Sequence, residues 1–505
     1  MSYLLALDQG TSSSRAIVYD ATGQVLAVAQ QDITCTYPDD GWVEQDPELL
    51  WSSVLETARK AIADAGVAPD AIAGIGITNQ RETTLVWERE SGRCVHNAIV
   101  WQDRRTAARC AEMAGRQVPG AHGEPVRLDE LIAAQTGLVI DPYFSSTKLA
   151  WILDQDPGLR ARAAAGELCF GTVDSFLIWR LSKGSTHVTD ASNASRTQLF
   201  DIHTQAWSPE LLGWFEVPPE MLPAVTDNAG LLATADAEWL GAAIPITGSA
   251  GDQQAALIGQ GCLAAGMTKS TYGTGCFVMA NTGARALASK QQLLTTVAYR
   301  LNDSVTYALE GSIFVAGVAV KWARDMLGLI DEAGDTARAF EATAGDTGGV
   351  YVVPAFTGLG APHWVPEARG LITGLTLDST RDQVVTALLQ AVAFQTHELL
   401  EAMAGDGAAV DSLRVDGGMV VNDPLCQFLA DLLDTPVERP VDVETTAMGA
   451  AILAGLGCGL FDDIDAAATM WRLDRRFSPA MADSRRQTLL AGYAAAVSQA
   501  LATRT

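Results

Sequence analysis

The sequence predicts an α/β protein of two domains related by an internal repeat. Its 505 residues are too many for one hydrophobic core. Short apolar strands alternate with helical patterns along most of the chain. Two apolar hairpins with Gly-Thr turns, at residues 4–20 and 268–280, give each half a similar start. We therefore expect a first domain over residues 1–254 and a second over residues 255–505, with a ligand held between the two hairpin turns.

The turn of the first hairpin is expected to hold an anion. Gly10 lets the backbone approach a ligand closely, and Arg15 adds a fixed positive charge with forked donors. Asp8 ends an apolar strand, where a carboxylate is costly unless it meets a cation. With the hydroxyls of Thr11, Ser12, Ser13 and Ser14, these groups suggest a phosphate chain with its Mg²⁺. For this turn alone, a polar hairpin with a solvated Asp8 is an equally open interpretation.

The first half continues with a helix and a buried strand that ends in charge. A helix is expected over residues 48–64, where Asp46 is a suitable N-cap. The strand at residues 72–78 runs into Arg81 and Glu82, and α/β sheets place ligands at the carboxyl ends of such strands. Arg81 could donate to the hydroxyls of a small polyol and Glu82 could accept from them. A surface ion pair explains these two residues equally well.

Two aromatic residues of the first half are candidates for ligand contacts. Trp101 follows a predicted strand at residues 98–100 and could line the carbon side of a substrate, although the core is the usual place for such a Trp. Tyr143 lies in a loop before a helix at residues 149–154. It could present its hydroxyl to a ligand, and a buried Tyr anchored to the backbone is equally ordinary.

The second hairpin lies among glycine-rich turns. A turn within residues 244–257 places Asp252 at a helix start, within reach of whatever binds the turn. A third strand is expected at residues 305–309. Residues 310–322 are expected to be helical, with Gly317 inside the helix at a cost of about 1 kcal/mol relative to Ala. Such a glycine often marks the close approach of a neighbour or ligand.

Three further segments follow in the second half. A long helix is expected over residues 381–403, and a helix of small residues suited to close packing over residues 445–454. After a strand at 413–416, the Gly417-Gly418 turn could let a flat base lie against the backbone. A plain tight turn is an equally open interpretation.

Bulk composition and missing motifs exclude several classes. The net charge of −26, from 34 basic and 60 acidic residues, argues against sequence-independent nucleic-acid binding and against docking on anionic membranes. Eight cysteines without a CxxC pair fit a reducing compartment. With no signal-peptide pattern and no membrane-length apolar run, we expect a soluble, cytoplasmic protein. P-loop and protein-kinase signatures are absent, and the six histidines lack metal-site spacing.

Taken together, seven segments resemble the FGGY carbohydrate kinases of the sugar kinase, actin and heat-shock ATPase superfamily. They occur in family order and span nearly the whole chain. Within the family, the resemblance is strongest to the members that act on glycerol. The segments are residues 8–15, 78–83, 100–105, 141–145, 251–255, 272–277 and 415–418.

The resemblance implies two ribonuclease-H-like domains of the actin-like ATPase type around a central cleft. It implies glycerol bound by the first domain and ATP mainly by the second. The implied glycerol-binding residues are Arg81, Glu82, Trp101, Tyr143, Asp252, Gln253 and Phe277. The implied nucleotide-binding residues are Thr11, Ser12, Ser13, Arg15, Thr274, Gly317, Lys321, Gly418 and Asn422. The family more often has Gln at the position of Lys321.

The implied reaction is phosphorylation of glycerol by ATP to sn-glycerol 3-phosphate. Asp252 would accept the proton of a terminal hydroxyl, and Asp8 would help to organise Mg²⁺. A homodimer or homotetramer is implied, while residues 226–246 lack the loop that binds fructose 1,6-bisphosphate in certain bacterial members. The alternatives are another FGGY kinase acting on xylulose, ribulose or gluconate, an actin-like structural ATPase, and an inactive sugar-binding regulator.

Overall fold

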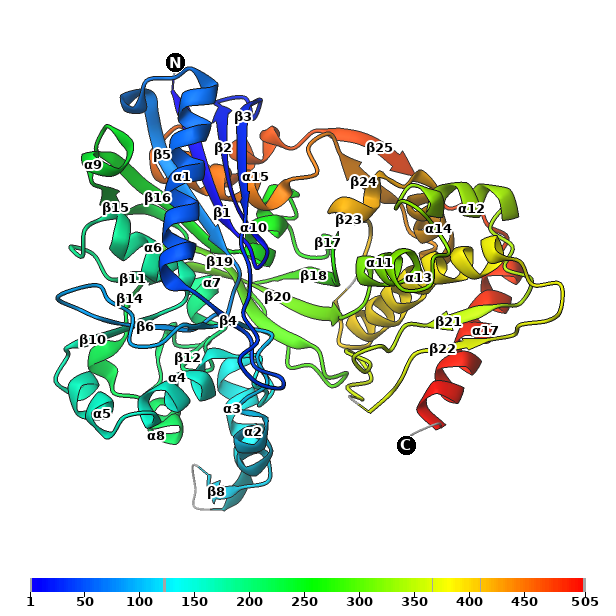
Figure 1. Cartoon of the computed structure of the whole chain (residues 1–505), viewed down its shortest axis with the longest axis horizontal. Helices are drawn as coiled ribbons and strands as arrows, with labels where there is room; N and C mark the ends of the chain where they lie inside the picture. Colours follow the sequence, from blue (N-terminus) through cyan, green and yellow to red (C-terminus); the bar gives the residue numbers. More distant parts are fainter. Residues whose placement is uncertain (1, 121–123, 366, 409, 503–505) are drawn as a thin grey trace.

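The chain folds into two lobes, each built on one β-sheet with helices against it. The structure is a computed structural model and describes residues 2–120, 124–365, 367–408 and 410–502. Figure 1 shows the first half of the chain, from blue to green, on one side and the yellow to red segments mainly on the other. The two-domain α/β prediction is confirmed by this arrangement.

The first sheet has six strands in the order β15-β16-β5-β1-β2-β3. Strands β1, β2 and β3 are successively antiparallel. Strands β5 and β16 run parallel to β1, and β15 closes the edge in the antiparallel direction. The bounds are β1 (Tyr3–Gln9), β2 (Ser13–Asp20), β3 (Val25–Asp32), β5 (Ile72–Asn79), β15 (Ala229–Ala235) and β16 (Ile244–Gly251).

The second sheet repeats this order in seven strands, β19-β20-β18-β17-β23-β24-β25. From β20 onward it again has three antiparallel strands, then two parallel strands, then one antiparallel strand. The repeat predicted from the two hairpins is therefore a repeat of the whole sheet. The bounds are β17 (Thr268–Tyr272), β18 (Cys276–Gly283), β19 (Leu294–Leu301), β20 (Ser304–Ile313), β23 (Leu413–Asp416), β24 (Val437–Pro440) and β25 (Leu473–Phe477).

Local signals account for the first elements. In β1, Leu4, Leu5, Ala6 and Leu7 are all buried, so both faces of this strand meet apolar side chains. Helix α1 (Pro47–Ala65) begins where Asp46 caps it, with Oδ1 accepting the N–H of Glu48 at 2.9 Å. It packs on β2 and β3. The predicted helix at residues 48–64 is confirmed.

One helix of the second half covers the first sheet. Helix α15 (Thr445–Gly457) packs against β1, β5 and β16, and against α10 (Asp252–Gly259). In Figure 1 it appears in orange among the blue strands. A Cβ atom on Gly449 would lie 1.8 Å from the carbonyl oxygen of Ala255, and one on Gly76 would lie 2.0 Å from that of Ala450. The close packing expected of this small-residue helix is confirmed.

Other helices complete the second lobe. The long helix α13 (Arg381–Gly405) begins with a capping box in which Thr380 and Gln383 satisfy each other's backbone N–H groups. Around it lie α11 (Gly317–Asp325), α12 (Asp335–Thr343), α14 (Asp423–Leu433) and α17 (Asp483–Ala502). Among the described residues, no helix has both the length and the apolar character that a bilayer crossing requires.

One prediction of local structure was wrong, and one strand was missed. Residues 310–322 are not one helix, because Glu310 lies within β20 and Gly317 is the first residue of α11. Residues 310–313 are buried, so no polar face reveals the strand. The strand expected at 98–100 is confirmed as the short strand β7 (Ala98–Ile99), whereas β19 was not predicted.

Candidate active site

The ends of two neighbouring parallel strands bring the candidate glycerol-binding residues together. Asn79 at the end of β5 is paired in register with Gly251 at the end of β16. Arg81 follows the first strand and Asp252 follows the second, as the first residue of α10. The Nε atom of Arg81 lies 3.0 Å from Oδ1 of Asp252.

The guanidinium of Arg81 is held firmly on its other side. Its Nη1 donates to Oε1 of Gln254 at 3.2 Å and to Oε2 of Glu310 at 2.5 Å. Its Nη2 donates to Oε1 of Glu310 at 3.2 Å and to the hydroxyl of Tyr143 at 3.5 Å. The four Nη hydrogens therefore have protein acceptors, while Nε faces Asp252.

Arg196 holds Glu82, the second charged candidate for substrate binding. Nε of Arg196 donates to Oε1 of Glu82 at 2.7 Å, and its Nη2 donates to Oε1 of Glu310 at 3.0 Å. We call Arg81, Glu82, Arg196 and Glu310 the buried ion cluster, because none of the four is more than 2% exposed. Its two positive and two negative charges balance. Glu82 also has φ of 60°, a left-handed conformation that is uncommon for a residue with a side chain.

The pKa values of the two glutamates of this cluster are shifted in opposite directions. Burial acts to raise the pKa of Glu310, but the charges of Arg196 and Arg81 outweigh it and hold that pKa at about 2. Burial raises the pKa of Glu82, and the same two arginines oppose the rise without cancelling it. Glu310 is therefore a fixed negative charge at neutral pH.

Three aromatic rings form a wall beside these polar groups. The ring centroids of Trp101 and Tyr143 are 5.6 Å apart, and those of Trp101 and Phe277 are 6.4 Å apart, both edge to face. Trp101 and Tyr143 come from the first half, whereas Phe277 lies on β18 of the second sheet. Nε1 of Trp101 donates to Oγ1 of Thr11 at 2.8 Å, which joins the wall to the first hairpin turn.

The first hairpin forms as predicted, and its strands pair with Asp8 opposite Arg15. Burial raises the pKa of Asp8 to about 6; Arg15 acts against this rise, and the nearby charge of Asp252 adds to it. The N–H of Gly10 donates to the carbonyl of Ser13 at 2.9 Å and closes the turn. Arg15 forms an ion pair with Glu444 and donates from Nη2 to Oε1 of Gln30 at 2.9 Å.

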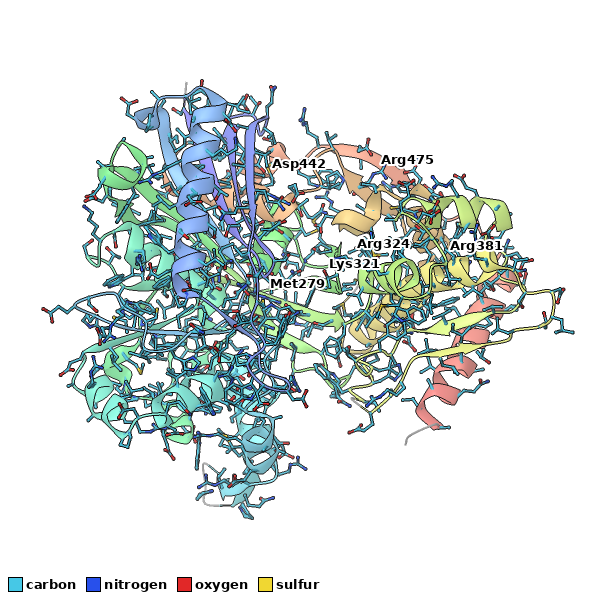
Figure 2. The ribbon with its side chains drawn as sticks, viewed as in Figure 1. Met279, Lys321, Arg324, Arg381, Asp442 and Arg475 are labelled. Carbon is cyan, nitrogen blue, oxygen red and sulfur yellow. The ribbon has the colours of Figure 1, made fainter. Side chains whose placement is uncertain are left out.

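The second lobe contains a pocket of about 220 Å³. Its lining includes the five candidate nucleotide-binding residues of the second half, which are Thr274, Gly317, Lys321, Gly418 and Asn422. A Cβ atom on Gly317 would lie 2.6 Å from the carbonyl oxygen of Gly273, so this position requires glycine. Arg324, which the sequence analysis did not single out, also lines the pocket, and Figure 2 shows it with Lys321 on α11.

Gln253 is fixed by a lysine that the sequence analysis also missed. Nζ of Lys269, on β17, donates to Oε1 of Gln253 and to Oγ1 of Thr271, the latter at 2.9 Å. Lys269 is fully buried, and burial lowers its pKa although Asp416 and Asp252 oppose this shift. This contact links the second sheet to the start of α10.

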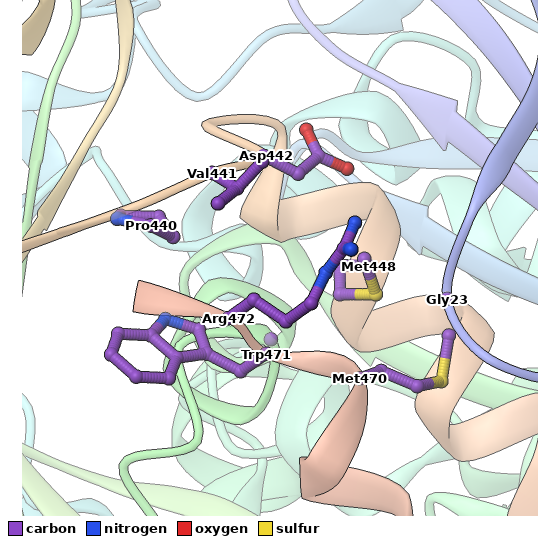
Figure 3. Close-up of a pocket in the computed structure, with 9 residues that line it drawn as sticks. Gly23, Pro440, Val441, Asp442, Met448, Met470, Trp471 and Arg472 are labelled. Atoms are coloured by element: carbon purple, nitrogen blue, oxygen red, sulfur yellow. The ribbon is translucent and has the colours of Figure 1, made fainter. Parts of the chain in front are cut away.

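A second pocket lies apart from these residues and is much smaller. Figure 3 shows it beside Asp442, Trp471 and Arg472, with Met448 and Met470 on its wall. Its volume of about 10 Å³ is enough for about one water molecule. It is too small for a metabolite.

The carboxylates present suit a magnesium ion carried with the nucleotide. Within the described part of the chain, no three His, Cys, Asp or Glu side chains gather as a metal site. Mg²⁺ commonly binds through one or two carboxylates together with substrate phosphates and water. The raised pKa of Asp8 is what a carboxylate shows when its burial is not balanced by a nearby cation.

The chain belongs to the FGGY family of carbohydrate kinases. Residues 3–259 match the N-terminal domain of this family, and residues 268–458 match its C-terminal domain. The family resemblance and the two-domain fold class are thereby confirmed.

Individual relatives agree over the full length. The chain is 57% identical to the glycerol kinase of Ectopseudomonas mendocina, over 98% of each protein. The crystal structure of Plasmodium falciparum glycerol kinase with ADP aligns with a TM-score of 0.90 and 34% identity, covering 99% of this chain and 98% of that one. Gluconate kinase from Lactobacillus acidophilus aligns with a TM-score of 0.87 at 20% identity over 99% of this chain and 98% of that one, which shows a shared fold.

Proposed function

We propose that this protein transfers the γ-phosphoryl group of ATP to glycerol and forms sn-glycerol 3-phosphate. One observation supports this most directly. Arg81, Glu82 and Asp252 lie together beside the aromatic wall, which offers polar partners for hydroxyls and apolar surface for carbons. The glycerol kinases among the full-length relatives support the same substrate.

Asp252 is the proposed general base. Its Oδ1 lies 3.0 Å from Nε of Arg81 and accepts the N–H of Gln253 at 2.7 Å. Among the residues that the structure describes, Oδ2 of Asp252 has no hydrogen-bond partner, and the side chain is 30% exposed. This oxygen can accept the proton of a terminal hydroxyl while the hydroxyl oxygen bonds to the γ-phosphorus and the bond to ADP breaks.

The proposed nucleotide site uses both lobes. Thr11, Ser12, Ser13 and Arg15 would hold the phosphates from the first hairpin, and Thr274 from the second. The pocket residues Gly317, Lys321, Gly418 and Asn422 would hold the nucleoside, as their common lining position supports. Asp8 would hold Mg²⁺, which when bound neutralises phosphate charge.

Three broader expectations belong to the same proposal. The expected boundary between residues 254 and 255 falls within α10, after the last strand of the first sheet and before the first strand of the second. A reducing cytoplasm fits eight free thiols. A homodimer or homotetramer fits the exposed apolar residues Val25, Leu26 and Val28 on β3, which is an edge strand.

A coupled assay of ADP formation tests the substrate. We expect the highest kcat/KM with glycerol among glycerol, xylulose, ribulose and gluconate. Turnover of xylulose or gluconate without turnover of glycerol would overturn the proposal in favour of another kinase of the family. Sedimentation with ATP and without glycerol is the companion measurement, because filaments in the pellet would indicate an actin-like ATPase.

A further inference from the structure

Glu310 lies on β20 of the second sheet and places a buried negative charge beside the candidate substrate site. On β20 it is paired with Met279 of β18 and with Leu294 of β19, so its backbone is fixed on both sides. Its two carboxylate oxygens both accept from Arg81, and one of them also accepts from Arg196. The side chain has no exposed surface.

Stability alone is a poor explanation for the buried ion cluster. Removing charges from water costs several kcal/mol per ion, and apolar side chains of similar volume are often at least as stable in such places. The Nη1 atom of Arg196 is itself buried without a hydrogen-bond partner, so the cluster is not fully satisfied. A buried cluster at the edge of a substrate site is better explained by the orientation that it imposes.

The cluster orients Arg81 relative to Asp252, and both residues are proposed to contact the substrate. Glu310 accepts one hydrogen bond from each Nη atom of Arg81. These two bonds direct Nε toward Asp252, at 3.0 Å. If Glu310 lost its charge, the carboxylates left near Arg81 would be Asp252 and Glu82, the latter 3.9 Å from Nε. The guanidinium would then turn toward these residues and occupy oxygens that the substrate needs.

We propose that Glu310 is a positioning residue for the kinase reaction, and that Arg196 assists it by holding Glu82. Glu310 fixes the guanidinium of Arg81 so that Asp252 keeps one oxygen free for the acceptor hydroxyl, and Arg196 fixes Oε1 of Glu82 so that Oε2 can face the same substrate. This inference rests on the proposed glycerol kinase function. Neither residue is assigned a proton-transfer step.

The first test compares two variants that lose ion pairs between the two halves of the chain, two pairs in the first variant and one in the second. Glu310→Gln keeps the shape of the side chain and removes its charge. Asp227→Asn is the matched control, because Asp227 of the first half pairs with Arg300 of β19 at 2.6 Å and has no hydrogen bond or ion pair with Arg81 or Glu82 among the described residues. Each variant is assayed for kcat and for KM with glycerol and with ATP, and glycerol binding is measured calorimetrically without nucleotide.

We expect Glu310→Gln to lower kcat/KM for glycerol about 100-fold, as a displacement of about 1 Å in a catalytic site does. Calorimetric glycerol affinity should fall as well, while KM for ATP changes by no more than about twofold. Glu310→Asp, which retains the charge, should recover part of the loss. Asp227→Asn should behave as the unmodified protein does toward glycerol.

A folded Glu310→Gln variant with glycerol kinetics equal to those of the control would overturn the proposal. Equal losses for glycerol and for ATP would do so too, since they would indicate a general structural role. If Glu310→Gln does not fold, Arg196→Lys decides, because it keeps the charge and loses the fork that holds Glu82 and Glu310. It should raise KM for glycerol about tenfold, and an unchanged KM would refute the positioning role.

Failure of the proposed glycerol kinase function can be distinguished from failure of the positioning role of Glu310. If the unmodified protein does not phosphorylate glycerol, the glycerol assignment alone is wrong. The same variants are then compared with the polyol that the protein does phosphorylate, and the expected selective loss against that polyol still tests Glu310.

Discussion

Asp252 combines a fixed position with a free oxygen. As the first residue of α10 it is held by the helix itself, and one of its oxygens is occupied by Arg81 and by the N–H of Gln253. These contacts fix the direction of the carboxylate and leave its second oxygen open, as the proposed transfer of a proton from an alcohol requires.

Asp252→Asn tests this role with almost no change in shape. An amide cannot take the hydroxyl proton, so we expect kcat to fall about 10²- to 10⁴-fold while KM for ATP changes little. Steady-state kinetics with glycerol and ATP measure the effect, and circular dichroism checks the fold. Asp40→Asn, in an exposed loop, serves as the control. Turnover close to that of the control would rule out the assignment of Asp252 as the base.

His187 makes stability depend on pH in a defined direction. Its Nε2–H donates to the carbonyl of Phe170 at 2.8 Å, and its ring meets that of Trp87 edge to face. Burial lowers the pKa of His187 to about 4. The unfolded chain takes up this proton near pH 6.5, so the contribution is complete above that pH and is lost as the pH falls toward about 4.

We expect His187 to account for a loss on the order of 2–3 kcal/mol in unfolding free energy between about pH 7 and about pH 4. Urea denaturation of the protein and of His187→Gln at both pH values measures it. The variant keeps a donor for Phe170 but does not titrate, so its own loss should be smaller. Equal losses in both proteins would mean that His187 does not titrate with a lowered pKa.

The sequence predicted many side chains near the site but not the groups that hold them. Arg81 and Glu82 were identified because charged residues follow a buried strand, and Asp252 because it follows a glycine-rich turn at a helix start. The structure brings the three together. Glu310 was missed because its segment was assigned to a helix. Its contact with Arg81 joins residues 229 positions apart in the chain. Such a contact depends on how two sheets meet, which no local pattern reveals.

Helices α10 and α15 pack so closely that the backbone of one helix lies against the backbone of the other. Glycines allow this approach, since a Cβ atom on Gly259 would lie 1.9 Å from the carbonyl oxygen of Thr445 and one on Gly449 would lie 1.8 Å from that of Ala255. The start of α10 carries Asp252. The spacing of this helix pair therefore also places the proposed base.

Gly449→Ala should separate the two helices. Because the added methyl group meets backbone that cannot give way easily, we expect a loss of about 1–3 kcal/mol or more in unfolding free energy, measured by urea denaturation. Gly213→Ala is the control, since Gly213 lies in helix α8 (Pro209–Phe215) with nothing within 4 Å of its added Cβ atom. This control should gain up to about 1 kcal/mol. Similar changes in both variants would contradict the close-contact explanation.

Helices and strands with strong local signals were the ones predicted correctly. Helix α1 has an N-cap and a proline at its start, and β1 and β2 flank a polar turn. By contrast, β19 and the end of β20 are buried on both faces, so they lack the alternation that identifies a strand. Their position beside β18 is set by tertiary packing.

Each half of the chain has an apolar core of its own, and a third apolar cluster is shared between the halves. Helix α15, from the end of the second half, contributes Ala450 and Leu453 to the same apolar cluster as Leu4, Ala6 and Ile17 of the first sheet. One face of that sheet is therefore covered partly by residues of α15, more than 400 positions further along the chain, together with residues of α10. The repeat in the sequence predicted the two sheets. The small residues of α15 predicted close packing, but they did not predict that the helix packs on the first sheet.

We expect a fragment of residues 1–254 not to fold alone. Without α10 and α15, the face of the first sheet that holds Leu4 and Ile17 is exposed, and such a surface promotes aggregation. Cooperative unfolding and binding of a hydrophobic dye are the measurements. Co-expression with residues 255–505 should restore a soluble complex. A soluble fragment that unfolds cooperatively would show that the first lobe is independent of α15.

Arg15 already has an anion beside it before any ligand arrives. Its guanidinium pairs with Glu444, a side chain that is 45% exposed and sits just ahead of α15. In the proposed nucleotide site, ATP would displace Glu444 from Arg15, and the same carboxylate would pair with the arginine again after the reaction. Competition from Glu444 would then lower the affinity of Arg15 for bound ADP and favour product release.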